Sequence, residues 1–243
     1  MVFRIKKPIE ARYFVLHFKL KILYLAVSAE KLKVVNGRKT RTACELGIEK
    51  WIQEKKVLGQ IKNIGFSVHG IHDEFLKLLD IYDWGFCLIQ YNYLNANYQA
   101  GTAGLKKAAE KGLPVIVMEP LLRGKLANGL PQKAVDIFRA ANISLTPAAW
   151  GLRWLWNQKE VTVVISGMNE ISQLEKNITT AENAVPDMLT YKENEVYESA
   201  IKIIKESYKI PCTGYNYCMP CPKNVNPKDS SLPSLLRRNA FIK

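Results

Sequence analysis

Three of the chain's five cysteines lie within the segment IPCTGYNYCMPCPKNV, residues 210–225. They are Cys212, Cys218 and Cys221, and the last two are spaced as C-x-x-C. Closely spaced thiolates on a loop that contains Gly and Pro suit an iron–sulfur cluster, because soft sulfur ligands bind iron and loop N–H groups can donate to the sulfides. A zinc site completed by water or His and a set of free thiols are the alternatives. The segment therefore predicts metal binding or redox chemistry.

A second set of polar residues follows short apolar stretches that are rich in β-branched and aromatic residues. If such stretches are the parallel strands of a barrel, their carboxyl ends meet on one face, and that face holds the active site. Polar groups at strand ends can also serve only to satisfy the backbone of the following loop. The residues concerned are Ser67, His69, Gln90, Tyr91, Asn92, Glu119, Ser166 and Gly167.

The elements that carry these residues alternate along the chain between strand-like and helix-like patterns. Such alternation indicates βαβ units and a parallel sheet. No G-x-G-x-x-G follows a strand, so a (β/α) barrel is favoured over a doubly wound nucleotide-binding sheet. The strands are predicted in the ranges 63–70, 86–94, 113–122 and 161–167. The helices are predicted in 44–56, 73–82, 103–112, 170–178 and 191–209, and one further helical stretch follows the third strand, includes 147–157 and ends at Gln158.

Composition excludes several classes of function. The formal net charge of +13 comes largely from lysines that are mixed with glutamates on helical segments, which is typical of solvated helix surfaces and not of nucleic-acid binding. No apolar run approaches the roughly 18 residues that a membrane helix needs. An odd number of cysteines argues against a secreted disulfide framework. We therefore expect a cytoplasmic protein with neither a nucleic-acid nor a membrane partner.

Five blocks of sequence together resemble the aldo/keto reductase family, and in particular its branch with a C-terminal ferredoxin-type 4Fe-4S segment. The resemblance extends from about Ala43 to Asn226. It implies a (β/α)8 barrel of the TIM type that transfers hydride between NAD(P)H and a small-molecule carbonyl substrate. It also implies that the four predicted strands are the fifth to eighth of the barrel. The blocks are IKNIGFSVHG, IQYNYLNANYQAG, GLPVIVMEPLL, VTVVISGMNEISQLEKNI and IPCTGYNYCMPCP.

The resemblance also implies contacts to the cofactor. Ser67 and Gln90 match the residues that hold the nicotinamide carboxamide, a group that needs both a donor and an acceptor. The helix that follows the eighth strand would receive the adenosine phosphate at its N-terminus. Glu170 in its first turn would repel a 2′-phosphate, so both NADP and NAD are retained. The matching residues on this side are Ser166, Gly167, Met168, Gln173 and Asn177.

The family's catalytic set of Tyr, Lys, Asp and His has one match in this chain. The block RYFVLHFKL resembles the fourth barrel strand, predicted at 12–18, and His17 lies at the matching position at the end of that strand. A tyrosine with a pKa near 10 needs a nearby cation to act as an acid at neutral pH, and no counterparts of the Tyr, Lys and Asp are found. The sequence alone therefore does not decide whether the chain is an enzyme.

About five of the eight βα units have a counterpart, which predicts a partial barrel. Residues 1–41 form an atypical N-terminal segment, 42–185 the barrel portion, and 186–243 a helix followed by the cysteine segment. Two hypotheses follow: an oxidoreductase with an iron–sulfur electron-transfer segment and a redox partner, or a truncated, inactive or partner-dependent remnant that needs a completing chain.

The family's iron–sulfur segment has the frame C-x-x-C-x-x-C-x-x-C-P, and Cys212, Cys218 and Cys221 fit it. Tyr215 stands where the frame has its second cysteine. Phenolate is a harder donor than thiolate, so the resemblance implies a 4Fe-4S cluster with three thiolate ligands.

Overall fold

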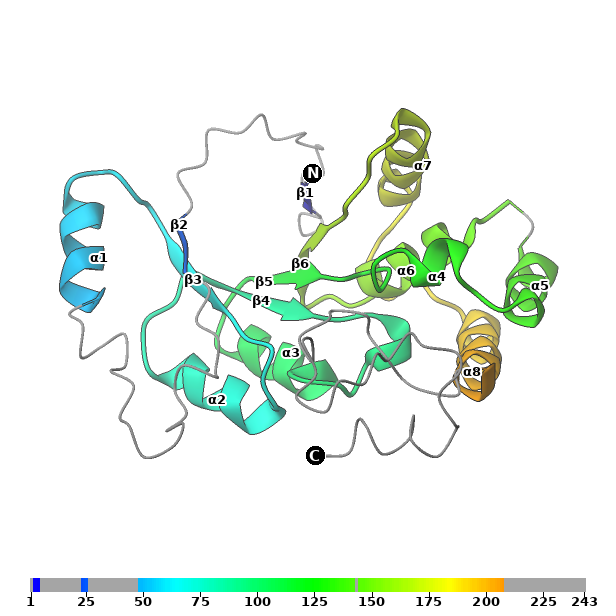
Figure 1. The fold of residues 1–243 in the computed structure, drawn as a ribbon, viewed down its shortest axis with the longest axis horizontal. Helices are drawn as coiled ribbons and strands as arrows, with labels where there is room; N and C mark the ends of the chain where they lie inside the picture. The colour runs from blue at the N-terminus through cyan, green and yellow to red at the C-terminus, as the bar shows by residue number, and fades with distance from the viewer. Residues whose placement is uncertain (1, 5–22, 26–47, 143, 208–243) are drawn as a thin grey trace, which may run out of the picture.

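The computed structural model describes residues 2–4, 23–25, 48–142 and 144–207 (Figure 1). Six strands in these ranges form one sheet, in the order β1-β6-β5-β4-β3-β2. Strands β2 to β6 pair in parallel, whereas β1 pairs antiparallel with β6. The strands are β1 (Val2–Arg4), β2 (Leu23–Leu25), β3 (Ile64–Ser67), β4 (Phe86–Gln90), β5 (Val115–Met118) and β6 (Val161–Ile165).

Helices separate the consecutive strands from β3 to β6, as parallel pairing requires. The predicted succession of βα units is therefore confirmed from residue 48 onward. The structure adds two short helices, η2 and α4, and separates α5 from α6. The helices are α1 (Ile48–Val57), α2 (His72–Asp80), η2 (Tyr93–Asn95), α3 (Gly101–Glu110), α4 (Lys125–Asn128), α5 (Gln132–Ala141), α6 (Pro147–Trp156), α7 (Ile171–Glu182) and α8 (Tyr191–Ser207).

The strand beside β3 is β2, at Leu23–Leu25. The range 12–18, where the sequence predicts the fourth barrel strand, lies outside the described residues, and so does His17. Cys212, Cys218 and Cys221 also lie outside them. The cofactor residues implied by the family resemblance are all described.

The two faces of the sheet have different surroundings. Alternate strand residues, among them Phe66, Cys87 and Val117, pack in a buried apolar cluster with residues of α2, α3 and α6. The residues between them point to the opposite face of the sheet. Gln90 of β4 and Met118 of β5, which are partners in the register of the two strands, both lie on this second face. All five residues of β4 are buried, which agrees with a strand covered on both faces. The second face is the one that carries the predicted cofactor residues Ser67 and Gln90.

Helix α8 is anchored to α6 by aromatic packing and by two polar contacts. The Tyr197 hydroxyl donates to the Trp150 carbonyl oxygen at 2.8 Å. Arg153 Nη2 donates to Glu193 Oε1 at 2.7 Å, and both side chains are largely shielded from water. Burial works to raise the pKa of Glu193, but hydrogen bonds from Thr190 and the charge of Arg153 outweigh it and leave this pKa below its ordinary value. These contacts fix the helix that leads to the cysteine segment.

No helix in the described ranges is long and apolar enough to cross a membrane.

Candidate functional site

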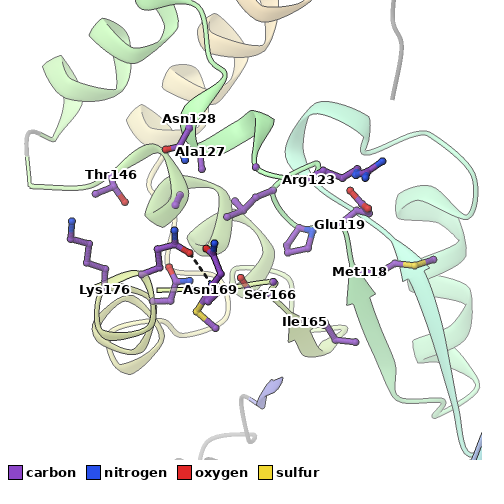
Figure 2. Close-up of a pocket in the computed structure, with 18 residues that line it drawn as sticks. Met118, Glu119, Arg123, Ala127, Asn128, Thr146, Ile165, Ser166, Asn169 and Lys176 are labelled. Carbon is purple, nitrogen blue, oxygen red and sulfur yellow. Dashed lines mark hydrogen bonds between the residues drawn. The ribbon is translucent and has the colours of Figure 1, made fainter. Parts of the chain in front are cut away.

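A cavity of about 530 Å³ opens at the carboxyl ends of β5 and β6 (Figure 2). Its walls come from three parts of the chain: the loop and short helix α4 that follow β5, the start of α6, and the connection from β6 into α7. The start of α6 is held in place by Thr146, whose hydroxyl accepts from the Ala149 N–H at 3.1 Å, and by Pro147 at the first helical position. The cavity thus lies where a barrel fold places its active face.

The residues predicted for the adenosine side of a cofactor all line this cavity. Ser166, Gly167 and Met168 follow β6, and Gln173 and Asn177 come from the first two turns of α7. The side-chain oxygen of Gln173 accepts from the Asn169 N–H at 3.3 Å, the contact drawn as a dashed line in Figure 2. Helix α7 begins after Glu170 without a side-chain cap. Its N-terminus therefore keeps the partial positive charge that favours an anion.

Ser67 and Gln90, predicted for the nicotinamide side, are not part of the cavity wall. They end β3 and β4 on the same face of the sheet as Met118, which does line the cavity. Gln90 is only 2% exposed, and neither its Nε2 nor its Oε1 has a hydrogen-bond partner. A buried amide without partners is costly, so Gln90 fits a site for a group that both donates and accepts.

Asn92 has a structural role, because its side chain forms hydrogen bonds with the backbone of two loops. It is 0% exposed, and its Nδ2 donates to the Glu119 carbonyl oxygen at 3.2 Å. Its Oδ1 accepts from the Asn95 N–H at 3.0 Å. Asn92 therefore ties the loop after β4 to the loop after β5, which forms one wall of the cavity.

The loop after β5 has a left-handed backbone at four positions. Glu119, Leu122, Arg123 and Gly124 have φ values of 56°, 47°, 55° and 83°. Such values are uncommon for residues with a side chain and are found preferentially at binding sites. The loop presents Glu119 and Arg123 to the cavity.

Two cations line the cavity and were missed by the sequence reasoning. Arg123 comes from the loop after β5, and Lys176 lies one turn beyond Gln173 on α7. The i,i+3 spacing from Gln173 could have identified Lys176, because residues so spaced share a helix face. Arg123 had no such signal, since its position depends on the path of a loop.

Tyr91 does not replace the missing acid tyrosine. Burial raises its pKa above the ordinary value, and the hydrogen bond to the Thr102 hydroxyl at 2.9 Å only partly opposes this effect. An acid at neutral pH requires a shift in the opposite direction. The Cys87 thiol is also unreactive, because burial raises its pKa to about 12.

Within the described ranges, no three His, Cys, Asp or Glu side chains are grouped so that they could hold a metal ion. The predicted metal ligands are not among these residues.

The sequence pattern of the aldo/keto reductase family matches residues 20–194. The chain belongs to this family. The match to the family pattern begins at residue 20. The resemblance seen in the sequence motifs began at about Ala43, so the family pattern extends it toward the N-terminus over residues 20–42. Strand β2 lies in that stretch, but its three strand residues carry none of the polar motifs that marked the other strands.

Solved aldo/keto reductases share the fold of this family member. One from Klebsiella pneumoniae in complex with NADPH has a TM-score of 0.54 at 17% identity, over 74% of this chain and 58% of that one. The holo form of one from Bacillus halodurans has a TM-score of 0.52 at 20% identity, over 74% and 60%. A second from Klebsiella pneumoniae, with NADP and acetate, has a TM-score of 0.51 at 21% identity, over 62% and 52%. No curated protein sequence matches the chain.

These likenesses confirm the predicted fold class, a partial TIM-type barrel of the aldo/keto reductase kind. The chain spans at most 60% of the length of the three relatives described here.

Proposed function

We propose that this aldo/keto reductase binds a nicotinamide dinucleotide and takes part in hydride transfer between NAD(P)H and a small carbonyl compound. The observation that carries the proposal is Gln90, an almost fully buried amide without partners on the sheet face that leads into the cavity. The cavity beside it has an uncapped helix N-terminus and two cations, as a phosphate-bearing ligand requires.

Each predicted residue has a defined task in this proposal. Gln90 and Ser67 hold the carboxamide and so fix the orientation of the ring. The start of α7, with Ser166, Gly167 and Met168, binds phosphate, and Gln173 and Asn177 contact the adenosine. When bound, the nicotinamide supplies the hydride. His17 is proposed to orient the carbonyl substrate.

NADP is the first candidate for the cofactor, because Arg123 and Lys176 favour additional negative charge. NAD is the alternative, since Glu170 carries a negative charge next to the first turn of α7.

Titration of the purified chain with NADPH and NADH, followed by protein fluorescence, tests the proposal. We expect saturable binding of both nucleotides, with NADPH the tighter. Lys176→Met should weaken NADPH binding several-fold, because it removes one cation from the cavity wall, whereas Lys202→Met on the exposed face of α8 should not. Failure of the unaltered chain to bind either nucleotide would overturn the proposal.

We also propose that Cys212, Cys218 and Cys221 hold a 4Fe-4S cluster that exchanges electrons with a redox partner in the cytoplasm. The softness and spacing of the three thiolates support this assignment. Helix α8, which is fixed against α6, provides a stable attachment for the segment that follows it.

Anaerobic purification with added iron should give a brown protein with acid-labile sulfide. Cys218→Ser should lose most of the iron, whereas Cys87→Ser, at a buried strand position, should keep it. Zinc in place of iron would support the zinc alternative, and a colourless protein without metal would support free thiols.

A second candidate function, cofactor binding without turnover by this chain alone, is favoured by the form of the sheet. Its described strands run in a linear order with β1 and β2 at the two ends, so the described strands by themselves do not close into a barrel. A partner chain would then complete the barrel. Rapid NADPH-dependent reduction of simple aldehydes or quinones by the purified chain would exclude this candidate.

A further inference from the structure

Glu119, the first residue after β5, has a strained and firmly held backbone. Its φ of 56° is unusual for a residue with a side chain, particularly one that precedes proline. Its carbonyl oxygen accepts from Asn92 Nδ2 at 3.2 Å and from the Leu122 N–H at 3.1 Å. These two bonds maintain the strained conformation and thereby fix the direction of the side chain.

The Glu119 carboxylate lines the cavity and is incompletely satisfied. Its Oε2 atom is buried and has no hydrogen-bond partner. An ionised carboxylate only accepts hydrogen bonds, and burying one without donors is costly. The missing donors are therefore expected to come from a bound ligand.

The position and charge of Glu119 restrict what that donor can be. Among the residues lining the cavity it is the only acid, so it disfavours phosphate at its own end. Figure 2 shows Arg123 close to Glu119 and Lys176 on the opposite side of the lining, so the negative charge of Glu119 offsets that of Arg123, and the excess positive charge lies at the Lys176 end. Phosphate groups of a ligand are thus directed away from Glu119. The ligand group that donates hydrogen bonds to the Glu119 carboxylate is therefore expected to be uncharged.

The position of Glu119 beside the strand end that carries Gln90 indicates which uncharged group of the cofactor donates to it. Glu119 directly follows Met118, the register partner of Gln90, so the unpartnered Oε2 of Glu119 and the unpartnered amide of Gln90 belong to the carboxyl ends of adjacent strands. In a nicotinamide dinucleotide, the group attached to the carboxamide-bearing ring is a ribose with two adjacent hydroxyls. The two oxygens of a carboxylate can accept from both hydroxyls of such a diol.

We propose that Glu119 binds the hydroxyls of the ribose on the nicotinamide side of the cofactor and selects for an intact diol there. The inference rests on the proposed function, since it assigns one further residue to the same ligand. Asn92 is the positioning residue that keeps Glu119 in place.

Binding of three nucleotides by the unaltered chain and by Glu119→Gln tests the inference. NADPH and ADP-ribose both carry the second ribose, whereas adenosine 2′,5′-bisphosphate carries only the adenosine ribose. We expect Glu119→Gln to weaken NADPH and ADP-ribose about tenfold, because charge-assisted hydrogen bonds to hydroxyls are lost. Binding of the bisphosphate should not change. Glu110→Gln, at an exposed position on α3, is the matched control and should bind all three as the unaltered chain does.

The other outcomes overturn the inference in distinguishable ways. Equal affinities of the unaltered chain and Glu119→Gln for ADP-ribose would exclude the ribose contact while leaving the proposed function intact. An equal loss for all three nucleotides would show that Glu119 only maintains the shape of the cavity. If the unaltered chain bound no nucleotide, both the inference and the proposed function would fail. Glu119→Gln is nearly isosteric and removes the charge of a carboxylate whose Oε2 is buried without a partner, so its melting temperature should not fall.

Discussion

Gly65→Ala is expected to lower the free energy of unfolding by about 3 kcal/mol or more. Gly65 lies opposite Phe86 in the β3–β4 pair. A Cβ at Gly65 would overlap the Phe86 ring and come 2.5 Å from the Phe86 carbonyl oxygen. The ring could turn away, but the carbonyl belongs to a buried central strand and cannot move without disturbing its pairing. Chemical denaturation monitored by circular dichroism measures the loss.

Gly167→Ala is the matched control for this prediction. No atom lies within 4 Å of a Cβ built at Gly167, and its φ is not in the left-handed region. We expect its stability to be unchanged or slightly increased, because alanine reduces the conformational freedom of the unfolded chain. If Gly65→Ala proved as stable as Gly167→Ala, β3 and β4 could not be as closely paired as the structure has them.

Gln90→Leu is expected to stabilise the protein and to abolish tight cofactor binding. Leucine has a similar size and removes two buried polar atoms that have no partners, so the free energy of unfolding should rise by about 1 kcal/mol. The same change removes the groups proposed to bind the carboxamide, and the Kd for NADPH should rise about tenfold or more. Denaturation and NADPH titration of the same preparation measure both effects.

The opposite signs of these two effects separate a ligand-binding amide from a structural one. Gln132→Leu, on the exposed side of α5, should leave cofactor binding unchanged and alter stability by about 0.5 kcal/mol at most. A loss of stability in Gln90→Leu would mean that the amide has a structural partner, and unchanged NADPH binding would remove it from the proposed site.

The predictions at Gln90 and Glu119 share a physical basis. Gln90 ends β4 and Glu119 directly follows β5, and both residues have buried polar atoms without partners. Each such atom costs stability in the absence of a ligand, and the same cost becomes affinity when a ligand supplies the missing hydrogen bonds. The carboxyl end of this sheet is therefore less stable than its apolar residues alone would make it.

Much of the fold could be predicted from the sequence, because its signals are local. Alternating apolar stretches and helical patterns predicted β3 to β6 and the helices between them. The segment PAAWGLRWLWN, residues 147–157, predicted the helix that the structure has as α6. That Ser166, Gly167, Gln173 and Asn177 belong to one site was implied by the resemblance to the aldo/keto reductase family, and all four line the cavity.

Only the tertiary structure decided the rest of the site, because it depends on contacts between distant residues. Asn92 and Glu119 are 27 residues apart, and their hydrogen bond maintains a backbone conformation that no local pattern predicts. Arg123 enters the cavity through the same loop. That Gln90 lacks partners follows from the way neighbouring strands and loops surround it, since an amide in the sequence does not reveal whether the fold will satisfy it. The sequence by itself thus determined the order of elements and the residues at their ends, whereas packing between strands determined which of those residues remain available to a ligand.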